Sequence, residues 1–217
     1  MIGIVTKHGM MKLQRLLKPA SIDQGVFLKK AQYLRIQATY LLQSSDVQTQ
    51  KVGRLLLERL VTDYPEEDFS TPFAKEQLGG YYLRIGIADF EKAEYYYRSA
   101  VEFCERQKST SGTSGMAKLR LARTILLSNQ TEKFEEAYQL VTSFPVSELL
   151  FNCYRFEHAE LAAHLCAKMK KNAEAKEYAK NALELAKITE PDFSRHKTLG
   201  LVHASDEQLE ALKKICS

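Results

Sequence analysis

The sequence predicts an all-α fold. Glycine and proline are scarce, at 10 and 5 of 217 residues, whereas turn-dense β folds need more of both. Apolar residues recur at the spacing of a helix face in several segments, and no segment gives a clear strand signal. We therefore expect about ten helices in a single helical domain that spans residues 1–217.

Residues 1–25 are expected to form a basic N-terminal segment. Residues 1–35 contain seven basic side chains and one acid, Asp23, although the whole chain has a net charge of only +4. Met10, Leu13 and Leu17 follow helical spacing, which would leave the basic side chains on a solvated helix face. The alternative is that this face binds nucleic acid or an anionic membrane.

Pairs of amphipathic helices are expected over residues 26–190. The first helix of each pair should lie within one of the ranges 26–43, 72–85, 116–127 and 146–169. The last range is long enough for two helices, with a break near residues 153–156. The second helix of each pair should lie within one of the ranges 53–64, 90–104, 134–144 and 175–186. Proline follows three of these second helices and ends them, because it cannot continue the hydrogen-bond ladder.

The clearest of these helices begins after Asp89. Its apolar stripe includes Phe90, Ala93 and Tyr97, and an acid-first pair, Glu94 with Arg98, predicts an exposed opposite face. The Ser-, Thr- and Gly-rich segment 108–115 should end it.

The C-terminal part, residues 191–217, should contain a capping helix. The sequence Ser205-Asp206-Glu207-Gln208 fits a capping box, in which the serine and the glutamine side chains each satisfy a free backbone amide. We expect the helix to continue to Ile215.

Small residues recur at one position of the second helices. These residues are Gly53, Ala93, Ala137 and Ala175, at intervals of 40, 44 and 38 residues, a period typical of helical solenoids. A small side chain lets the two helices of a hairpin approach closely, and a large residue four positions later fills the seam between them. The large residues are Leu57, Tyr97 and Val141.

The pattern Leu78-Gly79…Tyr82…Gly86…Phe90…Ala93…Tyr97…Ala100 resembles the tetratricopeptide repeat (TPR), and weaker matches extend the resemblance over residues 26–190. The family's Trp is absent and the repeats exceed its 34 residues. The resemblance implies a right-handed stack of antiparallel helical hairpins, a TPR-like α-solenoid. The alternative is an irregular α-bundle in which the period is accidental.

The TPR resemblance implies a non-catalytic protein–protein interaction module. Proteins of this family bind a partner segment in a concave groove built from the first helices, which here would be 73–83, 116–126 and 157–167. Phe73, Glu76, Arg123 and His164 fall at family positions that face this groove, and Phe73 and Arg123 are the expected anchors. Alternatively, Phe73 packs against the preceding hairpin. A second functional hypothesis is an immunity- or antitoxin-type protein that neutralises a single partner.

We expect no enzymatic activity, no cofactor and no metal, because no catalytic or phosphate-binding motif is recognisable. Cys104, Cys153, Cys166 and Cys216 form no evenly spaced framework, so they are interpreted as reduced, buried thiols of a cytoplasmic protein. A zinc site could be assembled from Cys153, His158, His164 and Cys166. However, the two histidines are six residues apart and would point to opposite faces of a helix.

Overall fold

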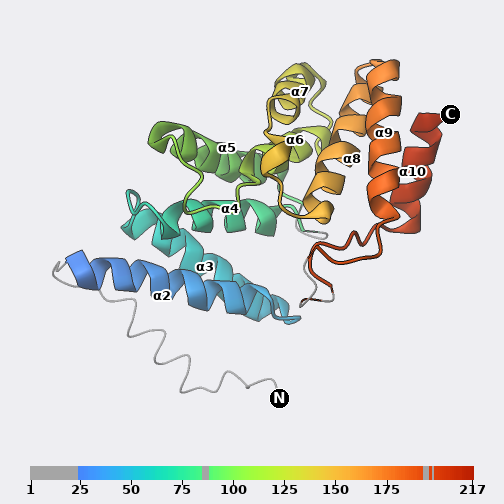
Figure 1. The fold of residues 1–217 in the computed structure, drawn as a ribbon. Coiled ribbons are helices and arrows are strands. Elements are labelled where there is room, and N and C mark those ends of the chain that lie inside the picture. Colours follow the sequence, from blue (N-terminus) through green and yellow to red (C-terminus); the bar gives the residue numbers. More distant parts are fainter. Residues whose placement is uncertain (1–23, 85–87, 193–195, 197) are drawn as a thin grey trace.

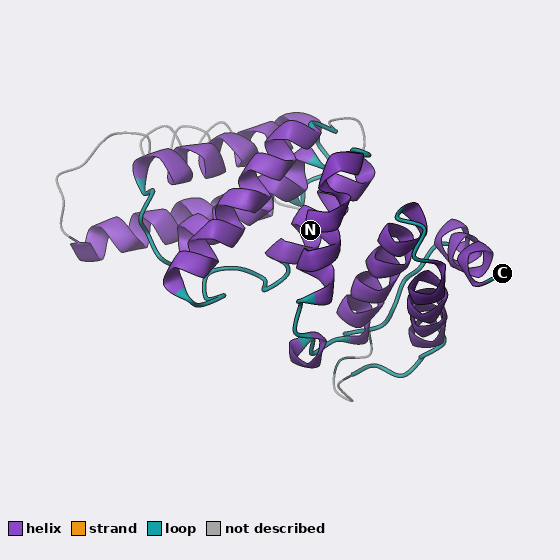
Figure 2. Ribbon diagram, turned by 90° about the horizontal axis from the view of Figure 1, so that it is seen from above, coloured by secondary structure: helices purple, strands orange, loops and turns teal. Residues whose placement is uncertain are grey.

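The computed structural model describes residues 24–84, 88–192, 196 and 198–217, and this part of the chain contains helices and connections but no strand (Figures 1 and 2). The predicted all-α class is confirmed. Nine α-helices and two short 3-10 helices lie within the described residues. Residues 1–23 of the basic segment, and Gly86 of the TPR pattern, lie outside them.

Most helices lie where the apolar periodicity predicts them. The first helices of the expected pairs are α2 (Gln24–Leu42), α4 (Ser70–Tyr82), α6 (Ala117–Leu127) and α8 (Asn152–Lys168). The second helices are α3 (Val47–Asp63), α5 (Phe90–Gln107), α7 (Phe134–Thr142) and α9 (Asn172–Ala186), and α10 (Asp206–Cys216) follows. The 3-10 helices are Thr131–Lys133 and Val146–Glu148.

Side-chain caps explain where several helices begin. The Asp46 carboxylate accepts a hydrogen bond from the Thr49 amide at 2.8 Å, and Asp89 accepts one from the Lys92 amide at 3.1 Å. The predicted capping box at Ser205 and Gln208 is confirmed, with both reciprocal hydrogen bonds formed.

One predicted boundary is wrong. The range 146–169 does not break near residues 153–156, because α8 runs through these residues without interruption. The break comes earlier, where Val146–Glu148 forms a 3-10 helix and Leu149 is extended, with ψ of 103°. Leu149 is 4% exposed and packs into the core, so tertiary packing sets the boundary.

The helices follow one another in space in chain order. Each α-helix from α2 to α9 packs on the next one, and contacts also join α2 to α4, α6 to α8 and α8 to α10. In Figure 1, α2 to α5 run across the view and α8 to α10 run up it, so the helix axes turn along the molecule. No described helix is sufficiently long and apolar to cross a membrane.

The predicted small positions lie in the core. Gly53, Ala93, Ala137 and Ala175 are all buried, and the large residues paired with them are at most 1% exposed. Buried apolar side chains form three clusters, centred on α2–α5, on α5–α8 and on α8–α10. Tyr178 of α9 contacts both the second and the third cluster.

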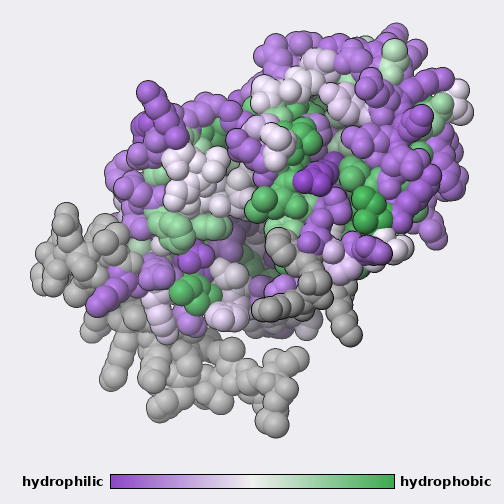
Figure 3. Space-filling view, viewed as in Figure 1, coloured by the Kyte–Doolittle hydropathy of each residue, from purple (hydrophilic) through white to green (hydrophobic). Residues whose placement is uncertain are grey.

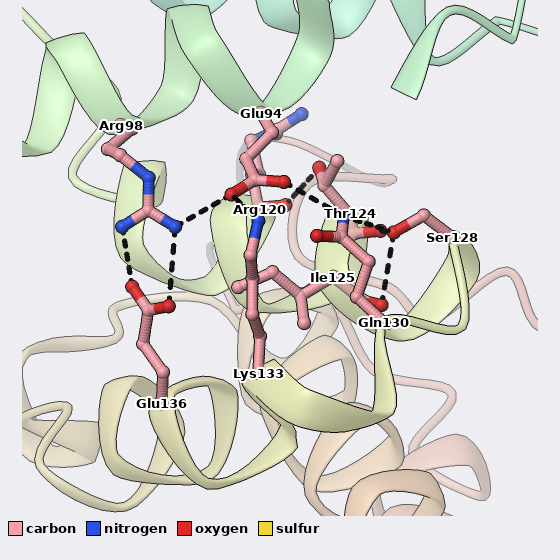
Figure 4. A network of polar contacts seen from close by, with 9 residues as sticks. All are labelled: Glu94, Arg98, Arg120, Thr124, Ile125, Ser128, Gln130, Lys133 and Glu136. Carbon is pink, nitrogen blue, oxygen red and sulfur yellow. Dashed lines mark hydrogen bonds and ion pairs between the residues drawn. The ribbon is translucent and has the colours of Figure 1, made fainter. Parts of the chain in front are cut away.

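A polar network joins α5 to the connection between α6 and α7 (Figure 4). Glu94 accepts hydrogen bonds from Arg98 at 2.7 Å, from Lys133 at 2.8 Å and from Gln130 at 2.8 Å. Arg98 also donates to Glu136 of α7 at 2.5 Å. The predicted Glu94–Arg98 pair therefore exists, but the expectation of an exposed face is wrong at Glu94, which is 9% exposed.

Candidate functional site

Two of the four predicted site residues line one cavity. Phe73 and Glu76 of α4 border a space of about 480 Å³ between α2, α4 and α6. The other residues that border it are Thr39, Leu42, Gln43, Gln77, Gly80, Arg84, Ser114 and Arg120. We call this space the α4 cavity.

Phe73 forms an apolar wall of the α4 cavity and also packs on the preceding hairpin. The Arg35 guanidinium of α2 lies 5.0 Å from the centre of its ring, and the Phe69 ring packs edge-on at 5.5 Å. The side chain is half-buried. Phe73 therefore packs on the preceding hairpin, and its role as a binding anchor stays a prediction.

Glu76 holds the α5–α6 connection, residues 108–116, against α4. Its carboxylate is 7% exposed and accepts hydrogen bonds from the Ser114 amide at 2.8 Å and from the Ser114 hydroxyl. Arg120 Nε of α6 lies 3.7 Å from Glu76 Oε1. A buried carboxylate needs such partners. Glu76 therefore links α4, the α5–α6 connection and α6 at one edge of the cavity.

Two buried polar atoms beside the α4 cavity lack hydrogen-bond partners within the described part of the chain. They are Arg120 Nε, a donor, and Gln77 Oε1, an acceptor. The Gln77 amide nitrogen does donate, to Thr39 Oγ1 at 2.8 Å, which fixes the orientation of the side chain. Burial would lower the pKa of Arg120, but Tyr97, to which its side chain is hydrogen-bonded, and the Glu157 and Glu76 carboxylates outweigh burial and raise that pKa, so the guanidinium is fully charged.

Arg123, the third predicted residue, lies beside a second cavity. Its guanidinium is 2.7 Å from Glu160 and 3.7 Å from Glu157, both on α8. These three side chains border a space of about 270 Å³, together with Cys153, Phe156, Val202, His203 and Gln208. Gln208 of α10 donates to Glu160 at 3.0 Å, so the C-terminal helix closes this side of the molecule.

Ion pairing keeps Glu160 charged although it is 4% exposed. Burial alone would raise the pKa of its carboxyl group, but the Arg123 charge and the hydrogen bonds from Arg123 and Gln208 lower it. His164, the fourth predicted residue, lies one turn further along α8 and borders neither of these two cavities. Burial lowers the pKa of its imidazole, which favours the neutral form at neutral pH.

Sequence reasoning missed Arg120 and Gln77. Arg120 lies three residues before Arg123, so helical spacing places both on neighbouring positions of α6. That spacing was available in the sequence. The missing hydrogen-bond partners of Arg120 and Gln77 depend on contacts with α2 and α4, which the sequence does not show.

The zinc alternative has no geometric support in the part of the chain that the structure describes. No three His, Cys, Asp or Glu side chains there are placed to share a metal ion. His158 is buried, and its Nε2 lies 3.0 Å from the Val141 carbonyl oxygen. All four cysteines are free, but only Cys166 is buried, so the expectation that all are buried thiols is wrong for the other three.

Comparison with protein-family models, with curated proteins and with solved structures finds no match. The TPR resemblance therefore rests on the sequence pattern. The functional argument must come from the two cavities and the residues around them.

Proposed function

We propose that this chain is a non-catalytic protein-interaction module of the TPR-like α-solenoid type, which binds an extended segment of a partner protein along α2, α4, α6 and α8. The contacts of α2 with α4 and of α6 with α8 support this arrangement, because first helices of successive hairpins adjoin in such stacks. The face that they form is the binding groove in this proposal.

One observation carries the proposal. The α4 cavity is bordered by Phe73 and by two side chains with buried polar atoms that lack a hydrogen-bond partner within the described residues: Arg120 Nε, a donor that lies 3.7 Å from Glu76 Oε1, and Gln77 Oε1, an acceptor. Buried polar atoms normally have partners, so these two call for a ligand that both donates and accepts. An extended peptide backbone offers N–H and C=O groups together, and an apolar side chain of the same peptide would contact Phe73.

The anchors follow from this arrangement. Nε of both arginines lacks a hydrogen-bond partner within the described residues, but Arg123 is paired with Glu160 at 2.7 Å, whereas Arg120 Nε lies 3.7 Å from Glu76. In the proposal, Phe73 and Arg120 provide most of the binding energy, and Glu76 supports them by positioning Ser114 and Arg120.

A displayed library of random peptides, selected on the full chain, tests the proposal. The selected peptides should bind Phe73→Ala and Arg120→Lys about tenfold more weakly than wild type. Tyr95→Ala is the matched control, because Tyr95 is an aromatic residue of α5 that is 66% exposed. Each variant must melt like the wild type.

Two results would overturn it. If the selected peptides bind Phe73→Ala, Arg120→Lys and the control with equal affinity, the proposed groove is refuted. Binding that instead falls steeply with salt and disappears in the double variant Lys12→Glu/Arg15→Glu would favour recognition of an anionic partner by the basic N-terminal segment.

A further inference from the structure

A third and larger cavity lies between the ends of α5 and α7 and the start of α6. It has a volume of about 560 Å³, within the range of 300–1,000 Å³ that is usual for small-molecule sites. One wall is the α5–α6 connection, and the other is the α7–α8 connection, residues 143–151. We call it the loop cavity. Figure 3 shows apolar side chains gathered near the middle of the molecule's face, over the α7–α8 connection.

The inner surface of the loop cavity is apolar. Val101, Met116, Ala117 and Leu149 border it and are each at most 7% exposed, so they form its floor. Phe144, Phe151 and Tyr154 add aromatic surface. Leu150 lies at the mouth of the cavity. It is 70% exposed and is among the most exposed large apolar side chains of the described residues.

The polar groups of the loop cavity are mostly neutral. Thr110, Thr113, Ser114, Ser143 and the Cys104 thiol border it. The hydroxyls of Thr113, Ser114 and Ser143 already donate, to the Thr110 carbonyl oxygen, to Glu76 and to the Gln139 carbonyl oxygen, so the Thr110 hydroxyl is the one of these that can donate to a ligand.

Two charged side chains border the cavity, Lys118 and Glu148. The Lys118 ammonium is neutralised by Glu105 at 3.0 Å, and Glu148 is exposed to water. An ionic ligand would therefore lose its hydration without meeting a buried countercharge, which is costly, whereas a neutral apolar ligand would not.

We propose that the loop cavity binds a neutral, predominantly apolar small molecule. The apolar body lies on Val101, Met116 and Leu149, and a single hydroxyl or carbonyl group of the ligand is met by the Thr110 hydroxyl of the α5–α6 connection. This cavity shares Ser114 with the α4 cavity, but its apolar floor and its mouth are formed by other residues. Binding here stands or falls independently of the proposed peptide-binding groove.

Fluorescence of the neutral probe N-phenyl-1-naphthylamine, titrated with the full chain, tests the inference. We expect saturable binding at one molecule per chain. Leu150→Glu places a charge at the mouth and should weaken binding about tenfold, because apolar contact is replaced by a hydrated carboxylate. Leu127→Glu is the matched control, since Leu127 is 54% exposed and does not border the cavity.

Cysteine footprinting supplies a second, site-resolved measurement. Bound probe should slow the alkylation of Cys104 by N-ethylmaleimide several-fold, and it should leave Cys216 of α10 unaffected, because only Cys104 borders the loop cavity. Non-saturable binding, equal loss in both leucine variants or an unprotected Cys104 would overturn the inference. So would tighter binding of a charged analogue, or a dimer of this chain that dissociates when the probe binds, which would assign the cavity to a second copy.

Discussion

Two adjacent glycines of α4 should respond in opposite ways to replacement by alanine. A Cβ atom added at Gly79 would lie 2.8 Å from Cζ and 2.9 Å from Cδ1 and Cδ2 of Tyr97, directly over the ring. At Gly80, the nearest atom is the Tyr97 hydroxyl oxygen at 3.5 Å, an ordinary contact. Tyr97 is 1% exposed and packed within the central apolar cluster, so its ring cannot move away freely.

The difference between the two variants isolates the steric cost. Both glycines are helical, so both replacements gain the same helix propensity, about 1 kcal/mol. Only Gly79→Ala adds overpacking, which costs about 1–3 kcal/mol. We therefore expect Gly80→Ala to stabilise the protein and Gly79→Ala to be less stable than Gly80→Ala by about 1–3 kcal/mol.

Urea unfolding followed by far-UV circular dichroism measures this difference directly, and in thermal melts each kcal/mol corresponds to about 2–4 °C for a chain of this size. Gly79→Ala should cost less in a Tyr97→Leu background than in the wild type, because the ring that the Cβ meets is then absent. Equal stability of the two glycine variants would refute the proposed close contact between α4 and α5.

Three further predictions concern the polar network, the hairpin seam and the thiols. Burial would raise the pKa of Glu94, but hydrogen bonds from Arg98, Lys133 and Gln130 lower it from 4.5 to about 2. The ionised carboxylate therefore stabilises the folded protein above pH 4.5, and this contribution is lost as the pH falls toward 2. Urea titrations of Glu94→Gln should accordingly show a weaker loss of stability over that pH range than wild type does. Ala93→Leu should cost about 1–3 kcal/mol, measured in the same assay, because Ala93 is 0% exposed at the α4–α5 seam; an unchanged free energy of unfolding would contradict the hairpin register. Reductant and chelator should leave the melting temperature unchanged, since all four cysteines are free, and stoichiometric metal in the purified protein would revive the zinc alternative.

Local patterns in the sequence predict the elements well because each depends on neighbours within a few residues. The spacing of apolar residues identifies α5 and α9, and the Ser205–Gln208 box identifies the start of α10. The burial of Ala93 and Ala137 also follows, since small residues at this spacing mark a close helix crossing.

Features that depend on distant contacts could not be predicted in this way. The sequence predicts that Glu94 is an exposed partner of Arg98. In the structure, Lys133 and Gln130, which lie nearly forty residues further along the chain, pack on Glu94 and bury it. The same is true of Glu76, whose partner Ser114 lies in a connection that the sequence identifies only as a loop.

The TPR resemblance placed Phe73 and Glu76 at the proposed groove, and the two residues border one cavity because both lie on α4. It could not foresee that Arg123 would be neutralised by Glu160, since that pairing depends on how α6 meets α8. Nor could it foresee the loop cavity, whose two walls are connections with no periodic pattern.

The division of the core into three clusters has a consequence for how the chain opens. Because each cluster is shared by only a few consecutive helices, a terminal helix can detach while the clusters beyond it stay closed. In α10, Leu212 is the one buried residue, so the backbone amides of this helix should exchange with solvent deuterium long before those of α6, which has six buried residues. Protection against exchange should therefore be high in α6 and α8, lower in α9 and lowest in α10.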